Sequence, residues 1–193
     1  TVGVGPTFAM RWLIPRLADF QQQHPDVEVR IATGGAINPI RDDWTCGILL
    51  GDGRWPGYET EALFSADLFP VCAPALAAKL RTPGDLRRHP ILQVAHALED
   101  WPLWLAAAGQ KWRPEKRSPR FDTYALALQA AVDGLGVAMG LRPYVADDLV
   151  AVRLVAPFER TVPAGKAWYL LWGPTRRDDP ALVAFRAWLR GQS

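Results

Sequence analysis

Three threonines stand where strands are expected to end and helices to begin. Thr7 follows Pro6 just after a short apolar run, Thr33 closes a later run, and Asp122-Thr123 precede a long apolar segment. A threonine at a helix start caps one backbone N–H, while other amides stay free at the positive end of the helix dipole. A carboxylate or another anion is favoured at such a place. The sequence therefore predicts an anion-binding site built from hydroxyls and helix starts.

The same residues have a second interpretation that involves no ligand. Thr7 stands at an N-cap position, and Thr7 and Asp122 could serve only as helix caps, each stabilising its helix by about 1 kcal/mol. Thr33 could simply end its strand. We expect Asp122 to cap the apolar helix and to point away from any ligand, because a fixed carboxylate would repel an anion.

The elements that would position Thr7 and Thr33 follow from the spacing of apolar residues. Val2 and Val4 alternate with glycines as in a short strand, and a helix begins at Pro6. Residues spaced three or four apart predict the buried face of that helix: Met10, Leu13, Leu17 and Phe20. The helix ends before Pro25, and residues 27–31 alternate as a second strand. Such a β-α-β unit places its turn residues at the strand ends where open α/β sheets bind ligands.

The rest of the chain alternates between strands and helices. Further strands are predicted at residues 46–51, 58–64, 68–73, 91–94, 136–140 and 167–172. Helices are predicted at residues 37–43, 74–80, 83–88, 101–108, 123–133, 143–149 and 180–190. This alternation indicates an α/β fold with parallel strands. There is no internal repeat, and periodicity alone does not distinguish one sheet from two.

Composition excludes several classes of function. A chain of 193 residues with 49% hydrophobic content can form one domain or two small lobes. The net charge is +2 and the basic residues are scattered along the sequence, so this segment is not expected to bind DNA itself. No apolar run is long enough to span a bilayer, and no signal peptide is present, so no membrane partner is expected. The chain begins inside a strand, as expected for an excised domain.

Motifs for catalysis or metal binding are not found. The sequence lacks GxSxG, HExxH, GxGxxG and phosphate-loop motifs, and its histidines are isolated. We therefore predict no catalytic residues, no metal site and no cofactor. Cys46 and Cys72 could form a disulfide, but buried free thiols of a cytoplasmic protein are the favoured interpretation.

A family resemblance covers nearly the whole chain. Residues 5–29, GPTFAMRWLIPRLADFQQQHPDVEV, resemble the opening of the effector-binding domain of LysR-type transcriptional regulators. The resemblance is closest to the subgroup of the glycine-cleavage activator and the β-lactamase regulator. Further similar segments follow in the family's order at residues 52–57, 68–76, 99–109, 121–140 and 178–189.

The resemblance implies a fold and a domain organisation. It predicts two Rossmann-like lobes with a cleft between them, of the type II periplasmic-binding-protein kind. Lobe I (RD-I) would comprise residues 1–66 plus 163–193, and lobe II (RD-II) residues 67–162. A winged helix-turn-helix DNA-binding domain would precede Thr1 in the parent protein, which would be a cytoplasmic homodimer or tetramer.

The resemblance also implies a ligand-binding set. Thr7 matches the hydroxyl residue after the first strand, Thr33 the end of the second strand, and Thr123 the small hydroxyl residue of lobe II. Trp168 lies about where an aromatic of the penultimate strand flanks the site, although such an aromatic more often belongs to the core, because aromatic side chains dominate core packing. Neighbouring residues and one substituted position complete the set: Phe8, Gly34, Leu49 and Tyr124.

Leu49 departs from the family pattern. The family strand commonly reads Asp-x-Ala-Ile-Arg-x-Gly, and here Leu49 replaces the arginine and Thr45 the aspartate. A guanidinium could clamp a carboxylate through two hydrogen bonds, and leucine cannot. We therefore predict a more apolar pocket, suited to a carboxylate with an apolar or aromatic body.

The sequence thus predicts an effector-sensing and dimerisation domain of a LysR-type regulator. Its partners would be a small-molecule effector, a second copy of itself, and DNA only through the missing N-terminal domain. The exposed side of the first helix, with Arg11 and Arg16, would be either a dimer contact or a solvated surface. The alternative is a solute-binding protein of a transporter with the same fold.

Overall fold

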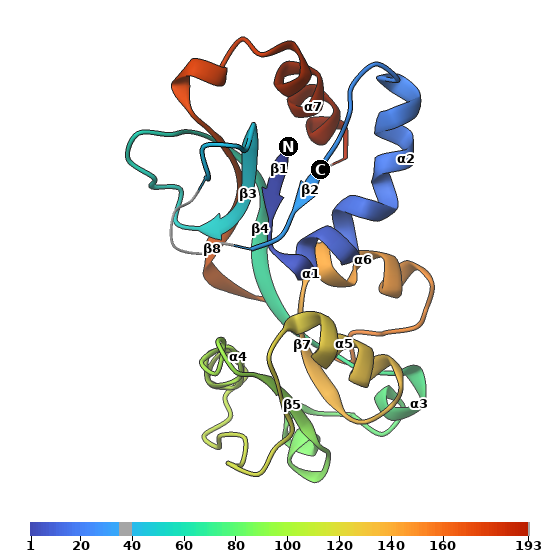
Figure 1. Ribbon diagram of the computed structural model, residues 1–193. Helices are drawn as coiled ribbons and strands as arrows, with labels where there is room; N and C mark the ends of the chain where they lie inside the picture. Colours follow the sequence, from blue (N-terminus) through green and yellow to red (C-terminus); the bar gives the residue numbers. More distant parts are fainter. Residues whose placement is uncertain (35–39, 193) are drawn as a thin grey trace. The chain divides into compact units, whose positions relative to one another are not determined.

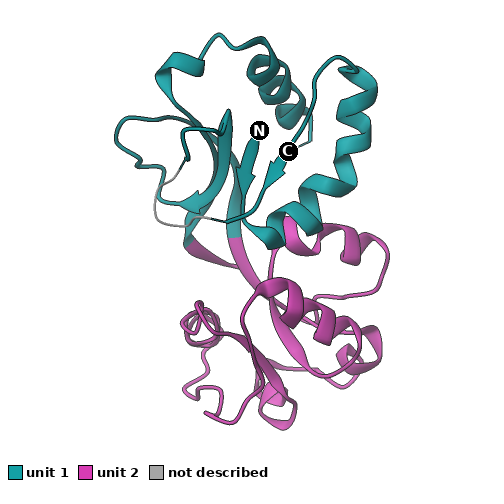
Figure 2. Ribbon diagram, viewed as in Figure 1, with its two compact units in different colours: residues 1–66, 165–193 teal, residues 67–164 magenta. Residues whose placement is uncertain are grey.

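Two long strands, β4 (Glu59–Val71) and β8 (Val162–Trp172), contribute residues to both compact units of the chain. The computed structural model describes residues 1–34 and 40–192. Unit 1 comprises residues 1–66 and 165–193, and unit 2 comprises residues 67–164 (Figure 2). The strand order is β2-β1-β3-β8-β4-β7-β5-β6 (Figure 1). The architecture is the α/β fold that the sequence predicts, but the strands are not all parallel, because β4 and β8 each pair antiparallel with a neighbouring strand.

The sheet of unit 1 is built around its first strand. β1 (Val2–Val4) pairs in parallel with β2 (Ile31–Ala32) on one side and with β3 (Cys46–Gly51) on the other, and β8 runs antiparallel to β3. A Cβ atom on Gly3 would lie 1.8 Å from a ring carbon of Trp44. Only glycine therefore allows this ring to cover the strand.

The helix after β1 contains a widened turn. It runs without a break through α1 (Pro6–Phe8), the π-helical segment η1 (Ala9–Leu13) and α2 (Ile14–Gln23). Pro15 explains the widening, because it has no N–H for the Arg11 carbonyl and its ring would clash with that carbonyl in a regular α-helix. The helix ends where the sequence predicts, just before His24.

The π-helical segment changes which side chains the helix buries. Trp12 and Leu13 are buried and so is Phe20, whereas Met10 is 58% exposed. The prediction that Met10 belongs to the buried face was wrong, because it assumed a constant α-helical turn through this segment. Leu17 is half-buried, at the margin of the predicted face.

The C-terminal helix completes unit 1. α7 (Pro180–Gly191) begins at Asp179, whose carboxylate accepts hydrogen bonds from the backbone N–H groups of Ala181 and Leu182 at 3.0 and 3.3 Å. It follows the short 3-10 helix η3 (Pro174–Arg176). Its buried residues are Leu182, Phe185, Trp188 and Leu189. The helix packs on α2, since the rings of Phe20 and Phe185 are 5.4 Å apart.

Unit 2 contains the strands at the other end of this order and a set of short helices. β5 (Ile91–Val94) lies in parallel between β6 (Arg120–Phe121) and β7 (Val137–Leu141), and the last residues of β4 pair antiparallel with β7. Its helical segments are α3 (Pro74–Ala77), the 3-10 helix η2 (Pro83–Arg88), α4 (Asp100–Ala107), α5 (Tyr124–Val132) and α6 (Arg142–Val150).

The structure corrects four predicted elements. The second strand covers only Ile31–Ala32, so residues 27–30 lie outside it. The strands predicted at residues 58–64 and 68–73 are one strand, β4, because pairing with neighbouring strands overrides the weak strand propensity between them. The helix predicted at 37–43 falls partly on residues 35–39, outside the described part of the chain, and residues 40–43 are not helical. The helix at 83–88 is a 3-10 helix.

The two cysteines are free and buried, as the favoured interpretation predicts. Burial raises the pKa of the Cys46 thiol to about 12 and that of Cys72 to about 11. Both side chains therefore act as small apolar core groups at neutral pH.

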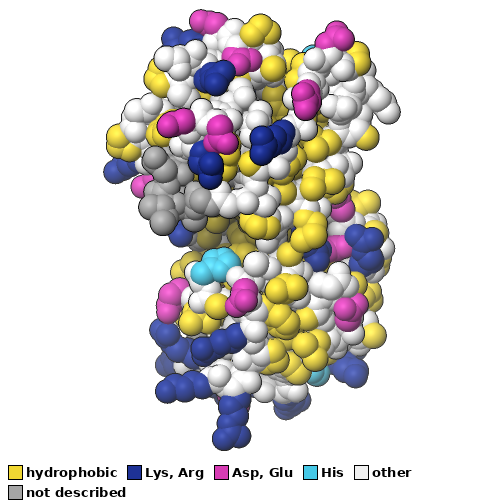
Figure 3. All heavy atoms as spheres, in the orientation of Figure 1, with side chains coloured by type: hydrophobic (Ala, Val, Ile, Leu, Met, Phe, Trp, Pro, Cys, Tyr) yellow, Lys and Arg dark blue, Asp and Glu magenta, His cyan; other side chains and the backbone are white. Residues whose placement is uncertain are grey.

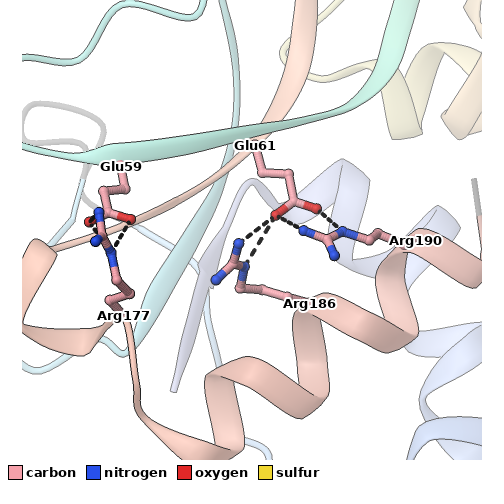
Figure 4. A network of polar contacts seen from close by, with 5 residues as sticks. All are labelled: Glu59, Glu61, Arg177, Arg186 and Arg190. Atoms are coloured by element: carbon pink, nitrogen blue, oxygen red, sulfur yellow. Dashed lines mark hydrogen bonds and ion pairs between the residues drawn. The ribbon is translucent and has the colours of Figure 1, made fainter.

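Carboxylates at the start of β4 bind arginines of the C-terminal segment (Figure 4). Glu61 accepts hydrogen bonds from the Nη2 atoms of Arg186 and Arg190, each at 2.9 Å. Glu59 accepts a bond from Nε of Arg177 at 2.9 Å. The hydrogen bond with Arg190, followed by that with Arg186, holds the pKa of Glu61 below its ordinary value of 4.5. The network fixes the C-terminal segment to β4 within unit 1.

We predict that Glu61→Gln lowers the free energy of unfolding at neutral pH by about 1 kcal/mol, the scale of a partly exposed charge network. The lowered pKa means that the folded state binds fewer protons than the unfolded state. The stabilisation is therefore present above pH 4.5 and is lost as the pH falls through the folded value. Denaturant unfolding at several pH values measures this, with exposed Glu28→Gln as the control. Equal losses in both variants would contradict the prediction.

The end of α6 is strained at one residue. The N–H groups of Val152 and Arg153 bond to the carbonyls of Leu149 and Asp148 at 3.2 and 2.9 Å, the pattern of a Schellman motif. This places Val152 at the left-handed position, with φ of 55°, where glycine is usual. A β-branched residue is disfavoured there by steric crowding.

We predict that Val152→Gly raises the free energy of unfolding by about 1 kcal/mol, because it removes the left-handed strain of a β-branched residue. Val150, which is exposed in the last helical turn, provides the matched control. Val150→Gly should lower stability, because glycine weakens a helix. Chemical denaturation of both variants makes the comparison, and a loss of stability in both would show that Val152 is not strained.

Candidate functional site

Three predicted site residues lie at one edge of the unit 1 sheet. β1, β2 and β3 are parallel and in register, so their carboxyl ends reach the same edge. Thr7 follows β1, Thr33 follows β2, and Leu49 lies in the second half of β3. We call this the unit 1 edge. It is the edge at which ligands bind in open α/β sheets.

Thr7 occupies a different helical position from the one predicted. The N-cap of the helix is Gly5, which makes no side-chain capping bond, and Pro6 occupies the first helical position. Thr7 therefore lies inside the first turn and is 7% exposed. The N-cap prediction for Thr7 was wrong, because Pro6 fits the first helical position and leaves the cap to Gly5.

Phe8 and Trp168 belong to an aromatic cluster beside this edge. Their ring centroids are 4.7 Å apart, and both side chains are almost completely buried. Trp12 lies 5.1 Å from Phe8 and 4.8 Å from Phe64. The sequence did not single out Trp12 or Phe64, although Trp12 stands one helical turn after Phe8. The cluster gives the start of the helix an apolar and rigid support.

Leu49 and Trp168 lie on opposite faces of the β3–β8 pair. Leu49 is opposite Tyr169 and Leu50 is opposite Trp168, and successive side chains of a strand point to opposite faces. Leu49 packs against the cluster of Trp44 and neighbouring aromatics instead. The structure therefore does not bring Leu49 onto the face of Phe8 and Trp168.

Thr33 and Gly34 lie beyond the end of β2, and both are exposed. Gly34 has φ of 135°, a conformation that L side chains rarely adopt. The glycine thus lets the chain leave the sheet edge directly after the Thr33 hydroxyl.

A second edge is present in unit 2. Thr123 follows β6 and is the N-cap of α5, its hydroxyl accepting a hydrogen bond from the Leu126 N–H at 3.4 Å. Asp122 was expected to be this cap, and that prediction was wrong. The Asp122 side chain is exposed, and its backbone carbonyl contacts Nδ1 of His96 at 3.0 Å. We call this region the unit 2 edge.

Tyr124 interacts with two side chains that no sequence motif links to it. It is 7% exposed, and its hydroxyl donates to the carboxylate of Asp100 at the start of α4. Burial, with the Asp100 charge as a further cause, raises the pKa of the Tyr124 phenol above its ordinary value. The ring of His96 lies 5.8 Å from that of Tyr124. His96 follows the carboxyl end of β5. This position alone could have identified it as a candidate site residue.

The chemistry available at the two edges is binding through hydroxyls and helix starts. At the unit 2 edge, the Thr123 cap lies at the positive end of the α5 dipole. Within residues 1–34 and 40–192, no group of three or more His, Cys, Asp or Glu side chains could hold a metal ion. In the same residues, no helix has the length and apolar character needed to cross a bilayer.

The fold and these edges define a ligand-binding domain of the type II periplasmic-binding-protein-like class. A family model described as the LysR substrate binding domain matches residues 1–193. The chain belongs to this family.

Relatives of known role align with nearly the whole chain. The transcriptional activator AmpR of Pseudomonas aeruginosa is 38% identical over 191 residues, which is 98% of this chain and 64% of that protein. The glycine cleavage system transcriptional activator of Escherichia coli K12 is 35% identical over 193 residues, covering 98% and 63%. The chain therefore spans slightly less than two thirds of the length of these curated relatives.

Solved structures show the same similarity. The effector domain of AmpR from P. aeruginosa superposes with a TM-score of 0.81 at 37% identity, over 99% of this chain and 93% of that one. The AmpR effector binding domain of Citrobacter freundii also gives 0.81, at 29% identity and over 99% and 96%. The family prediction is confirmed. The relatives are transcriptional activators, so the prediction that the chain is not an enzyme is confirmed and a transporter protein is not favoured.

Proposed function

We propose that this chain senses a small-molecule effector for a bacterial transcriptional regulator that acts in the cytoplasm and binds DNA through another domain. The observation that carries the proposal is the convergence of Thr7 and Thr33 at the unit 1 edge of a LysR substrate binding domain. The named relatives are transcriptional activators, which supports the same role here. We further propose that the two units are the lobes RD-I and RD-II of the family.

Both edges are candidate effector contacts in this proposal. One solved C. freundii effector binding domain carries replacements of a threonine, a serine and a tyrosine. The first and last of these are separated by the same number of positions as Thr7 and Trp168. The serine lies within two positions of the place that corresponds to Thr123 by this spacing. This spacing supports Thr7 and Trp168, and the neighbourhood of Thr123, as counterparts of the three replaced positions.

The proposed mechanism is a population shift. An effector that binds one conformation of the regulator better than another changes their ratio only by its difference in affinity. The Thr7 hydroxyl and the α5 start supply directional contacts, and the aromatic cluster fixes the helix that carries Thr7. Leu49 leaves no guanidinium at that position to clamp a carboxylate, and the cluster that supports the Thr7 helix is aromatic, so we propose a carboxylate ligand with an apolar or aromatic body.

Calorimetric titration of the chain with aromatic acids and with small dicarboxylates tests this proposal. We expect aromatic acids to bind more tightly, and Thr7→Val and Thr123→Val each to weaken binding about tenfold, as expected for a lost hydrogen bond to a charged group. Thr7→Ser and Thr123→Ser keep the hydroxyl and serve as matched controls. Unchanged affinity in both valine variants would remove these residues from the site, and a preference for dicarboxylates would contradict the apolar pocket.

We also propose that the chain self-associates through the exposed side of its first helix. Met10 and Ile14 are 58% and 52% exposed, four residues apart on one side of that helix. Arg16 was a candidate for this surface, but its guanidinium donates to the Trp12 carbonyl at 3.0 Å and lies over the Trp12 ring. Two neighbouring exposed apolar side chains make this side of the helix a candidate for a protein contact.

We predict that Met10→Glu or Ile14→Glu shifts the chain from dimer to monomer in sedimentation velocity, because a buried carboxylate without a partner opposes association. Val183, which is 48% exposed on α7, is the matched control. Val183→Glu should leave the dimer intact. A monomeric parent chain at high micromolar concentration would contradict the proposal.

A further inference from the structure

Unit 2 contains a basic cavity that the proposed function does not use. It has a volume of about 500 Å³, within the range of small-molecule sites. Its walls come from η2, the start of β5 and the loop before β6. Four of its lining side chains are arginines: Arg87, Arg88, Arg113 and Arg117. Lys and Arg side chains gather at this end of unit 2 (Figure 3).

The cavity lies at the opposite end of the strands from the unit 2 edge. Pro90 and Ile91 at the amino end of β5 line it, as do Ser118 and Pro119 just before β6. Thr123 follows the carboxyl end of β6. The usual rule for α/β sheets, which favours the carboxyl ends, therefore does not predict this cavity.

Positive charge in the cavity is only weakly compensated. Glu115 is its one acidic lining residue. Arg88 lies 3.8 Å from the Asp85 carboxylate and Arg113 lies 4.0 Å from that of Glu99, and both arginine side chains are highly exposed. Such pairs contribute little stability and are easily exchanged for a ligand. Within the described part of the chain, Arg87 and Arg117 take part in no ion pair.

The loop that forms one wall is anchored. Gln93 of β5 is buried, its backbone N–H donates to the Pro119 carbonyl at 2.9 Å, and its side chain donates to the Glu115 carbonyl at 3.4 Å. The Arg87 guanidinium lies over the Trp112 ring at 5.6 Å, which joins η2 to the loop. The arginines are thus presented by a supported wall, which lowers the cost of ordering them around a ligand.

We propose that this cavity is a second binding site and that it takes the phosphate groups of a small soluble molecule. Guanidinium groups match phosphate oxygens with paired donors, which a single lysine ammonium cannot do. The cavity is concave, with arginines on two walls, and this shape suits a small anion. A nucleic acid backbone would instead be followed by a basic stripe.

Titration of the 193-residue chain with inorganic pyrophosphate tests the proposal. We expect binding that Arg87→Gln and Arg117→Gln each weaken about tenfold, because each removes a charge-assisted hydrogen bond. Arg81→Gln is the matched control, since Arg81 is exposed in unit 2 but does not line the cavity. Thr7→Val and Thr123→Val should leave pyrophosphate binding unchanged, which separates this site from the proposed effector site.

Three results would overturn the proposal. The first is no binding of pyrophosphate to the parent chain. The second is an equal loss in Arg81→Gln, which would indicate only general electrostatic attraction. The third is tighter binding of duplex DNA than of pyrophosphate with the same dependence on Arg87 and Arg117, which would assign the arginines to a nucleic acid backbone. Thermal unfolding of each variant confirms that the fold is retained.

Discussion

The parallel pairing of β1 with both β2 and β3 is the constraint on which the unit 1 edge depends. Val2 lies opposite Ile31 on one side and Cys46 on the other, so the three strands begin in register and run toward the same edge. A shift of one residue in either pairing would turn the buried side chains of β1 to the other face. Gly3 contributes to this register, because the Trp44 ring occupies the space of its missing side chain.

The C-terminal segment packs in the same unit, although it is distant from β1 in the sequence. β8 adds an antiparallel strand beside β3, and α7 returns across the unit to pack on α2. The arginines of this segment meet carboxylates at the start of β4. These contacts join residues more than a hundred positions apart, so unit 1 is assembled from two segments that are distant in the sequence.

Much of the fold could be predicted because its signals are local. Proline at a helix start and the alternation of valine with glycine in β1 each depend on a few neighbouring residues. The position of Met10 could not be predicted, since the π-helical turn arises from the backbone conflict at Pro15. The opposite orientations of Leu49 and Trp168 also depend on a strand pairing between distant segments.

The clustering of positive charge in the basic cavity also could not be predicted from local sequence signals. The sequence presents its arginines as scattered, because Arg87 and Arg113 are separated by α4 and β5. The anchoring of the loop by Gln93 brings them onto facing walls. The unit 1 edge, in contrast, offers hydroxyls and an aromatic cluster but no arginine at Leu49. Binding at this edge should therefore depend less on ionic strength than binding in the cavity, which should fall steeply as salt is added.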